Sequence, residues 1–268
     1  MIRMIWAILL RDLRHETSYK SAFLMQLAGS VYLFFLFLML SRMFTGLPIQ
    51  SLRSYGSDYF PYVLTGIAVQ QYLYIAMNTF SGQLREAQLM GTFEAVMVTP
   101  VPLPVYLTGS LLFSFIINTF HIGIFLVLGV LSGAFNLPWV RIPSVLLVLF
   151  LSAGAFSSIG VLSASYCIVF KKGNPVAWLI AVTSALFGGV YFPSALLPAW
   201  LQGVPFWIPM THCLDALRGV LLQSKGPGDI FRSLMVLAAW TLVGLPLAGL
   251  AFHWAVQRGR KTGSLGQA

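Results

Sequence analysis

The carboxylates of this chain are the first residues to consider, because they could bind a cation, carry a proton or activate water. Seven of the 268 residues are acidic, and none of them lies inside a long apolar run. Transporters driven by protons or sodium ions usually hold the coupling ion on an ionisable group within the membrane. His121 is the ionisable side chain nearest to the middle of an apolar run, one turn after Asn118. A hydrogen bond to a neighbouring helix explains such a lone histidine better than a proton relay does, so ion-coupled transport is disfavoured.

Motifs for nucleotide binding and for catalysis are missing. A phosphate loop needs the pattern Gly-x-x-x-x-Gly-Lys-Ser/Thr, and residues 259–262, Gly-Arg-Lys-Thr, lack the second glycine and the preceding strand. There is no clustered Cys/His arrangement and no Ser-His-Asp pattern. His212 and Asp215 lie close together in sequence, but packing and capping explain them more simply than a catalytic site does. We therefore predict no cofactor, no metal site and no enzymatic activity in this chain.

A short polar segment, residues 81–99, interrupts two long apolar runs. It contains Arg85-Glu86 and the stretch GTFEAVMVTP, Gly91–Pro100, and the prolines that follow end any helix there. The segment is too polar to cross a membrane, yet its apolar residues could form one packed stripe. Either it is an ordinary loop with solvated charges, or it is an ordered segment that another protein grips.

The composition shows which environment these residues occupy. Hydrophobic residues make up 58% of the chain and charged residues 9%, and the mean hydropathy is +0.83. A soluble domain carries roughly 25% charged residues, so this chain cannot cover a surface that faces water. It is an integral membrane protein.

Six apolar runs are long enough to cross a bilayer, which takes about 20 helical residues. They lie at about residues 22–41, 60–80, 105–131, 142–170, 175–193 and 232–256. With the N-terminus inside, ten of the 16 lysines and arginines fall on the cytoplasmic side, which is the side they favour. We therefore predict an all-α membrane protein with six transmembrane helices and both termini in the cytoplasm. A net charge of +9 could suggest a nucleic-acid partner, but the placement of the basic residues fits the bias of membrane proteins. We therefore predict no nucleic-acid partner.

Residues 1–20 predict an amphipathic helix. Apolar residues recur at helical spacing from Ile2 to Leu13, while Arg3, Arg11 and Arg14 lie largely off that stripe. Such a helix rests in the headgroup plane of the membrane. It either anchors the first span or forms a groove with residues 82–98 that receives a partner.

The region between the fifth and sixth spans, residues 192–230, is apolar but interrupted by prolines. Segments of this kind at membrane depth are tolerated only where protein buries them or a cavity lies beside them. We predict a pair of re-entrant half-helices that enter from the outer face. The alternative is an interfacial loop with Trp200 and Trp207 in the aromatic belt.

Together these motifs resemble those of the six-helix permease subunits of bacterial ATP-binding cassette (ABC) exporters of the type V class. The resemblance covers nearly the whole chain, 1–268, which we predict to be a single transmembrane permease domain. It rests on the N-terminal helix, on Arg85-Glu86 with GTFEAVMVTP, and on Lys-Lys-Gly-Asn-Pro at 171–175. It is completed by GGVYFPSALLPAWL at 188–201 and IPMTHCLDALRG at 208–219.

The resemblance implies that residues 81–99 hold a coupling helix, seated with the N-terminal helix against a separate ATPase subunit. ATP and Mg²⁺ would bind to that partner. Two copies of this chain and two ATPase subunits would form the working unit in the bacterial inner (cytoplasmic) membrane, among its lipids. The implied coupling residues are Arg85, Glu86, Gly91, Thr92, Glu94, Thr99 and Pro100. The residues implied to close the outer end of the pathway are Phe192, Pro193, Leu197, Pro198 and Pro209.

Polar and aromatic residues on the second and fifth spans are our candidates for lining the pathway: Gln70, Gln71, Tyr74, Asn78, Phe187 and Tyr191. The polar ones are scattered rather than arranged in rings, so a selective channel is disfavoured. An apolar pathway with few charges suits a hydrophobic drug-like molecule or a lipid as the exported cargo. An oligosaccharide or a lipid-linked glycan is the alternative cargo. A membrane scaffold that anchors a cytoplasmic partner without transporting anything is the alternative from another class.

Overall fold

The computed structural model describes residues 2–18, 20–43, 58–89, 103–170 and 175–261, and within these ranges the chain forms helices joined by turns. The elements are α1 Ile2–Ser18, α2 Lys20–Arg42, α3 Tyr59–Leu89, α5 Leu103–Leu131, η2 Trp139–Arg141, α6 Ile142–Phe170, α7 Pro175–Phe187, η3 Ser194–Leu196, α8 Val204–Trp207, α9 Pro209–Leu221 and α10 Phe231–Lys261.

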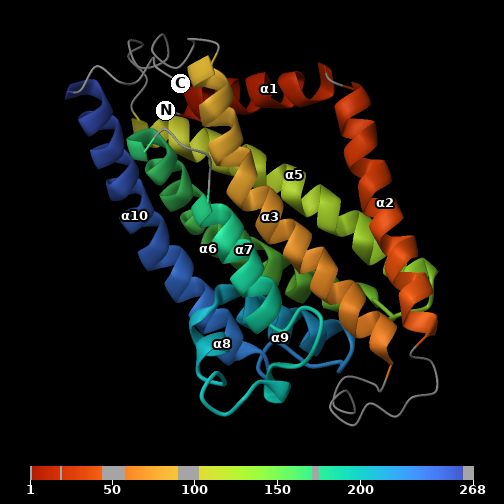
Figure 1. Ribbon diagram of the computed structural model, residues 1–268. Helices are drawn as coiled ribbons and strands as arrows, with labels where there is room; N and C mark the ends of the chain where they lie inside the picture. The colour runs from red at the N-terminus through yellow and green to blue at the C-terminus, as the bar shows by residue number, and fades with distance from the viewer. Residues whose placement is uncertain (1, 19, 44–57, 90–102, 171–174, 262–268) are drawn as a thin grey trace.

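The long helices form a bundle, and α1 runs across one end of it (Figure 1). The C-terminal end of α10 lies at the end with α1, whereas α8 and α9 lie at the opposite end. The apolar stripe of α1 rests on the start of α5, where Ile8 packs with Val105 and Tyr106. A Cβ on Gly109 would approach the side chain of Ile8 to 2.8 Å, so this glycine lets α1 lie close against α5. α1, Ile2–Ser18, falls within residues 1–20, where the sequence predicts an amphipathic helix; its place at the membrane interface stays a prediction.

The core of the bundle is built around α6. In its apolar stretch 67% of the residues are buried, against 17% for α2 and 11% for α10. The hydroxyl of Tyr72 on α3 donates a hydrogen bond of 2.9 Å to the Leu149 carbonyl of α6. Gly160 brings the two helices together, since a Cβ there would come within 2.6 Å of the Ala76 carbonyl oxygen. Small residues allow this close approach, and the van der Waals packing that results is one of the terms that hold helices together in a membrane.

Four helices in the described part of the chain are long and apolar enough to span a membrane. They are α2, α5, α6 and α10, with mean hydropathies between 1.9 and 2.3. α3 has 31 residues but does not reach the same level of apolar composition. α7 is apolar but has only 13 residues. The runs predicted at 60–80 and 175–193 fall on these two helices, and their crossing of the membrane stays a prediction.

Three predicted boundaries differ from the structure. α3 continues as one helix to Leu89, so the first part of the predicted coupling segment belongs to α3. α7 ends at Phe187 rather than near residue 193, because Gly189 follows with φ +83, a conformation that glycine adopts readily. In the segment 192–230, α9 is a half-helix of 13 residues, but the first predicted half-helix is reduced to η3 and the four-residue α8.

Candidate functional site

An arginine is buried at the end of the bundle opposite α1. Arg218 lies on α9 between Leu217 and Gly219, and its side chain is 1% exposed. A guanidinium keeps its charge at any ordinary pH. Removing that charge from water is costly unless hydrogen bonds and a favourable field compensate. The partners of Arg218 therefore determine why this end of the bundle is built as it is.

Those partners come from two other elements. Nη1 donates to the Gly189 carbonyl at 2.8 Å, and Nη2 donates to the carbonyls of Tyr62 at 2.9 Å and Val190 at 3.2 Å. Nε donates to the hydroxyl of Thr65 at 3.1 Å. The guanidinium also lies over the ring of Tyr62, 3.5 Å from its centre, which is a favourable place for a cation. One side chain thus joins the start of α3, the turn after α7, and α9.

The backbone of this junction requires glycine at two places. Gly189 has a φ of +83, and its carbonyl also accepts a 2.9 Å hydrogen bond from the Tyr62 hydroxyl. Gly66 faces the turn from α3, and a Cβ there would collide with the Val190 carbonyl oxygen. We call the set Tyr62, Thr65, Gly189, Val190 and Arg218 the arginine junction. It holds two helices and a turn in one fixed arrangement.

The sequence-based prediction did not select Arg218 as a site residue; it was counted only among the basic residues of the outer face. Its signal in the sequence was a basic residue between Leu217 and Gly219, in a mostly apolar stretch whose nearest acidic residue is Asp215. A charge in such a place needs hydrogen-bond partners if it is buried, so Arg218 was a candidate for a long-range contact.

The residues predicted to close the outer end of the pathway lie around this junction. Pro193 and Leu197 are buried, Phe192 is half-buried, and Pro198 is exposed. Pro209 is buried and begins α9, where its missing N–H costs nothing. These positions bring the predicted gate residues to one end of the bundle; whether they open and close stays a prediction.

His212 also lies at this end of the bundle. It is buried on α9. One ring nitrogen is 2.9 Å from the Phe206 carbonyl of α8, and the ring meets that of Phe206 edge to face with centres 5.6 Å apart. These contacts attach α8 to α9, in agreement with a packing role. Among the described residues, no group of three or more His, Cys, Asp or Glu side chains is placed to hold a metal ion.

The predicted pathway residues of α3 form one stripe. Gln70, Tyr74 and Asn78 are spaced four residues apart and so share a face of the helix, and Gln71 is adjacent to it. Tyr74 is 53% exposed in the single subunit, whereas both glutamines and Asn78 are half-buried. The Gln70 amide donates to the Ala181 carbonyl of α7 at 3.2 Å. This bond places α7 beside the stripe.

The other two predicted pathway residues extend the same side. Phe187 is half-buried at the last residue of α7. Tyr191 is 37% exposed, and its ring stacks on Phe37 of α2 with centres 6.2 Å apart. The structure therefore brings α2, α3 and α7 together around the predicted pathway residues. That these residues line a pathway remains a prediction.

The predicted coupling residues fall mostly outside the described residues. Gly91, Thr92, Glu94, Thr99 and Pro100 lie there. α3 carries the backbone of Arg85 and Glu86, but their side chains are also outside the described part of the structure. The end of α3 that carries them is the end where α1 runs across the bundle (Figure 1).

The neighbouring helix α1 carries an ion pair at that end. Arg11 and Asp12 are 2.7 Å apart, with 50% of the arginine side chain and 7% of the aspartate side chain exposed. The guanidinium of Arg11 lies 5.7 Å from the centre of the Tyr106 ring on α5. These contacts attach the amphipathic helix α1 to α5 at one end of the apolar bundle.

The described part of the chain is thus a bundle of long, mostly apolar helices, with an amphipathic helix across one end and short helices at the other. The family model for the ABC-2 type transporter matches residues 2–222 of this chain. The chain therefore belongs to the ABC-2 type transporter family.

Comparison with individual proteins agrees with this assignment. The chain is similar to the inner membrane transport permease YadH of Escherichia coli strain K12, with 25% identity over 202 residues that cover 70% of this chain and 76% of the relative. The same similarity is found to YadH of Escherichia coli O157:H7 and of Shigella flexneri.

Proposed function

We propose that this chain is the membrane-spanning subunit of an ATP-driven exporter of the type V class and that it works as a dimer with two copies of a separate ATPase subunit. The observation that carries the proposal is the ABC-2 family match over residues 2–222. ATP and Mg²⁺ bind to the partner subunit, and this chain supplies the substrate pathway. Its six spans cross the bacterial inner membrane with both termini in the cytoplasm.

The proposed coupling end is the one with α1. α3 reaches beyond the bundle core to Leu89, and Arg85 and Glu86 lie in its last turns. An ATPase that binds residues 81–99 together with α1 could therefore move α3 directly. ATP binding then shifts the equilibrium between inward- and outward-facing states, because the coupling segment contacts the ATPase differently in the two states.

The proposed gate is the opposite end. The arginine junction joins α3 to the turn after α7, and both helices carry predicted pathway residues. A movement of α3 at the coupling end is thereby transmitted to Tyr191 and to the gate segment at 192–209. The two-fold axis of the dimer brings the same residues from each copy together.

The proposed cargo is a hydrophobic drug-like molecule or a lipid. The faces of α3 and α7 around the stripe carry few charges, and the exposed side chains there, such as Tyr74, Trp178 and Leu179, are apolar or aromatic. Such surfaces suit a ligand taken from the membrane. An oligosaccharide or a lipid-linked glycan is the second candidate, since exposed aromatic rings also suit sugars.

The experiment begins with affinity purification of the tagged chain from gently solubilised membranes. We expect a soluble ATPase to co-purify in equal amount and to hydrolyse ATP. Charge reversal of both carboxylates, Glu86→Lys with Glu94→Lys, should remove the ATPase or uncouple its activity from transport while the chain still inserts. The matched control is Asp58→Lys, an exposed carboxylate just before the other end of α3, which should change neither.

Two results would contradict the proposal. A chain that purifies alone, with no ATPase activity, favours the scaffold interpretation. Full transport and ATP turnover in the double variant would show that the coupling segment lies elsewhere. In proteoliposomes, stimulation of ATP hydrolysis by hydrophobic compounds or lipids, but not by oligosaccharides, supports the proposed cargo, and the reverse pattern supports the second candidate.

A further inference from the structure

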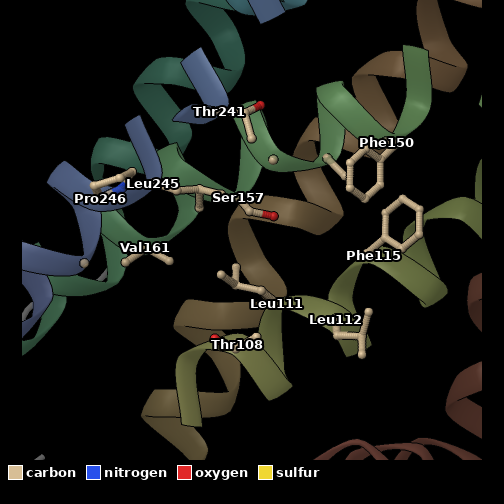
Figure 2. A pocket seen from close by; sticks show the side chains of 13 residues that line it. Thr108, Leu111, Leu112, Phe115, Phe150, Ser157, Val161, Thr241, Leu245 and Pro246 are labelled. Atoms are coloured by element: carbon tan, nitrogen blue, oxygen red, sulfur yellow. The ribbon is translucent and has the colours of Figure 1, made fainter. Parts of the chain in front are cut away.

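A cavity of about 490 Å³ lies between α5, α6 and α10, on helices other than those that carry the predicted pathway residues. Figure 2 shows its lining, with Leu111 and Leu112 of α5 on one side and Leu245 and Pro246 of α10 on the other. The residues that line it are Thr108, Leu111, Leu112, Phe115, Phe150, Ala153, Gly154, Ser157, Val161, Thr241, Leu245, Pro246 and Gly249.

The cavity exists because its three helices are packed unequally. α10 packs extensively on α6, whereas α5 packs mainly on α3 and α1. Small residues bring α10 and α6 together: a Cβ on Gly154 would collide with Thr241, and one on Gly244 would come within 2.8 Å of the Ser158 hydroxyl. α5 packs little against α6 or α10, so a space remains between α5 and α10.

The chemistry of the walls is apolar. No charged side chain lines the cavity. Three of the thirteen lining residues carry hydroxyls, Thr108, Ser157 and Thr241, and the other ten are apolar or glycine. The Thr241 hydroxyl donates within the protein, to the carbonyls of Leu151 and Leu237 at 2.9 Å each. A buried water needs two to four polar partners, and walls in which apolar residues predominate offer few. The cavity therefore suits hydrocarbon rather than water.

The size and the opening of the cavity indicate where that hydrocarbon comes from. The cavity volume of about 490 Å³ is many times the ~30 Å³ that one water molecule takes in the liquid, so it has room for a segment of hydrocarbon chain. Leu112 and Phe150 line the cavity and are also 40% and 60% exposed, so it opens at the surface of the spans. That surface continues into other exposed apolar residues, including Leu147 and Leu250. In a membrane this surface contacts the acyl chains of the bilayer.

The rings of Phe115 and Phe150 lie at one edge of the space. They meet edge to face with their centres 5.6 Å apart, and Figure 2 shows them side by side at the edge of the cavity, away from Pro246. Because Phe150 is 60% exposed, this aromatic pair borders the opening of the cavity.

We propose that this cavity is a binding site for one acyl chain of a membrane phospholipid, separate from the predicted transport pathway. The bilayer is the medium next to the opening, and the chain fills a space whose walls would otherwise lack contacts on one side. The site depends on the membrane location of α5, α6 and α10 and is independent of the cargo and of ATP coupling.

Photo-crosslinking tests this proposal. The full chain is reconstituted in vesicles of phosphatidylcholine and phosphatidylglycerol that contain a phosphatidylcholine with a diazirine in one acyl chain, and labelled residues are mapped by mass spectrometry. We expect the label to concentrate on lining residues such as Leu111 and Val161, above the level on the exposed but non-lining Leu147.

Gly249→Leu is the informative variant. Gly249 lines the cavity, and a Cβ added there meets nothing within 4 Å, so a larger side chain can start from this position without a clash. Gly123→Leu is the matched control, because Gly123 is also a glycine within a span with open space beside it but does not line the cavity. Labelling of Leu111 and Val161 should fall severalfold in the first variant and stay unchanged in the second. If Gly249→Leu is not recovered as folded protein, Gly249→Ala should give a smaller loss in the same direction.

The proposal is overturned if lining residues are labelled no more strongly than Leu147, or if Gly249→Leu leaves their labelling unchanged. A parallel arm adds a photoactivatable drug-like compound to vesicles without the diazirine lipid. If this compound labels the lining residues even in excess unlabelled phospholipid, the occupant is a drug-like molecule and not a lipid. That result would overturn the proposal as well.

Discussion

Replacing Arg218 with methionine tests the arginine junction directly. Methionine keeps an unbranched apolar chain on α9 but removes the charge and its donors. The carbonyls of Gly189 and Tyr62 keep the hydrogen bonds they accept from the hydroxyls of Tyr62 and Thr65, respectively. The Val190 carbonyl loses the guanidinium donor, and the Tyr62 ring loses its cation.

The size of the effect follows from these losses. A buried carbonyl deprived of a donor costs about 1–3 kcal/mol, and a desolvated contact between a cation and an aromatic ring contributes about 2 kcal/mol. Removing the guanidinium also removes the cost of keeping that charge away from water, which offsets part of both. We expect a net destabilisation of about 2 kcal/mol, which lowers the Tm of a chain of this size by about 4–8 °C.

The assay is thermal unfolding of the purified protein in mild detergent, followed by the fraction that elutes as a folded species after heating. Arg218→Lys should give an intermediate shift, because an ammonium retains the charge but lacks the planar fork that reaches four groups at once. The control is Arg232→Met on α10, whose side chain is exposed and lies 5.8 Å from the centre of the Phe206 ring. It should cost about 1 kcal/mol or less. An Arg218→Met protein as stable as Arg232→Met would refute the reasoning.

Three further predictions follow from the fold. Gly189→Ala should destabilise the chain by about 1–2 kcal/mol in the same assay, because alanine is strained at a φ of +83; a neutral effect would contradict the turn as described. Tyr72→Phe should cost about 0.6–1.7 kcal/mol through loss of the bond to the Leu149 carbonyl, and an unchanged Tm would show that this bond adds nothing. The predicted topology can be tested in a chain whose two native cysteines are replaced by alanine. A cysteine placed at exposed Ser18 should react with a membrane-impermeant maleimide only after the cells are opened. A cysteine placed at exposed Lys225 should already react in intact cells whose outer membrane is permeabilised. The opposite pattern of labelling would show that the chain lies in the membrane with the orientation opposite to the predicted one.

Much of the helical framework could be predicted from the sequence. The predicted run at 142–170 coincides with α6, which begins after Arg141 and is followed by Lys171 and Lys172. Charged residues at both ends of an apolar run mark such a helix reliably, because they cannot be buried without partners. The amphipathic stripe of residues 1–20 indicated α1 for a similar reason, since its period is that of a helix that buries one face.

Membership of a transporter family was also accessible from the sequence. The motifs at 81–99, 171–175 and 188–219 resemble those of ABC exporter permeases, and that resemblance implied a permease whose ATPase is another chain. The match to the ABC-2 type transporter family confirms the permease assignment. The coupling, pathway and gate roles of individual residues stay predictions, because each role depends on a partner chain or on a second conformation.

Tertiary structure alone decided how the ends of the helices are joined. From the sequence, Arg218 was one more basic residue of the outer face, because its partners Tyr62 and Gly189 are 156 and 29 residues away in the chain. The early end of α7 depends on the same junction. In the turn that follows α7, the carbonyls of Gly189 and Val190 accept hydrogen bonds from the buried guanidinium of Arg218. The cavity between α5, α6 and α10 has no sequence signature either. It arises because α10 packs closely on α6 while α5 stays apart from α10. Local patterns determine where helices form, because hydrophobic periodicity and backbone preferences act over a few residues. Which buried charge meets which carbonyl depends on how those helices pack, and that is a property of the whole fold.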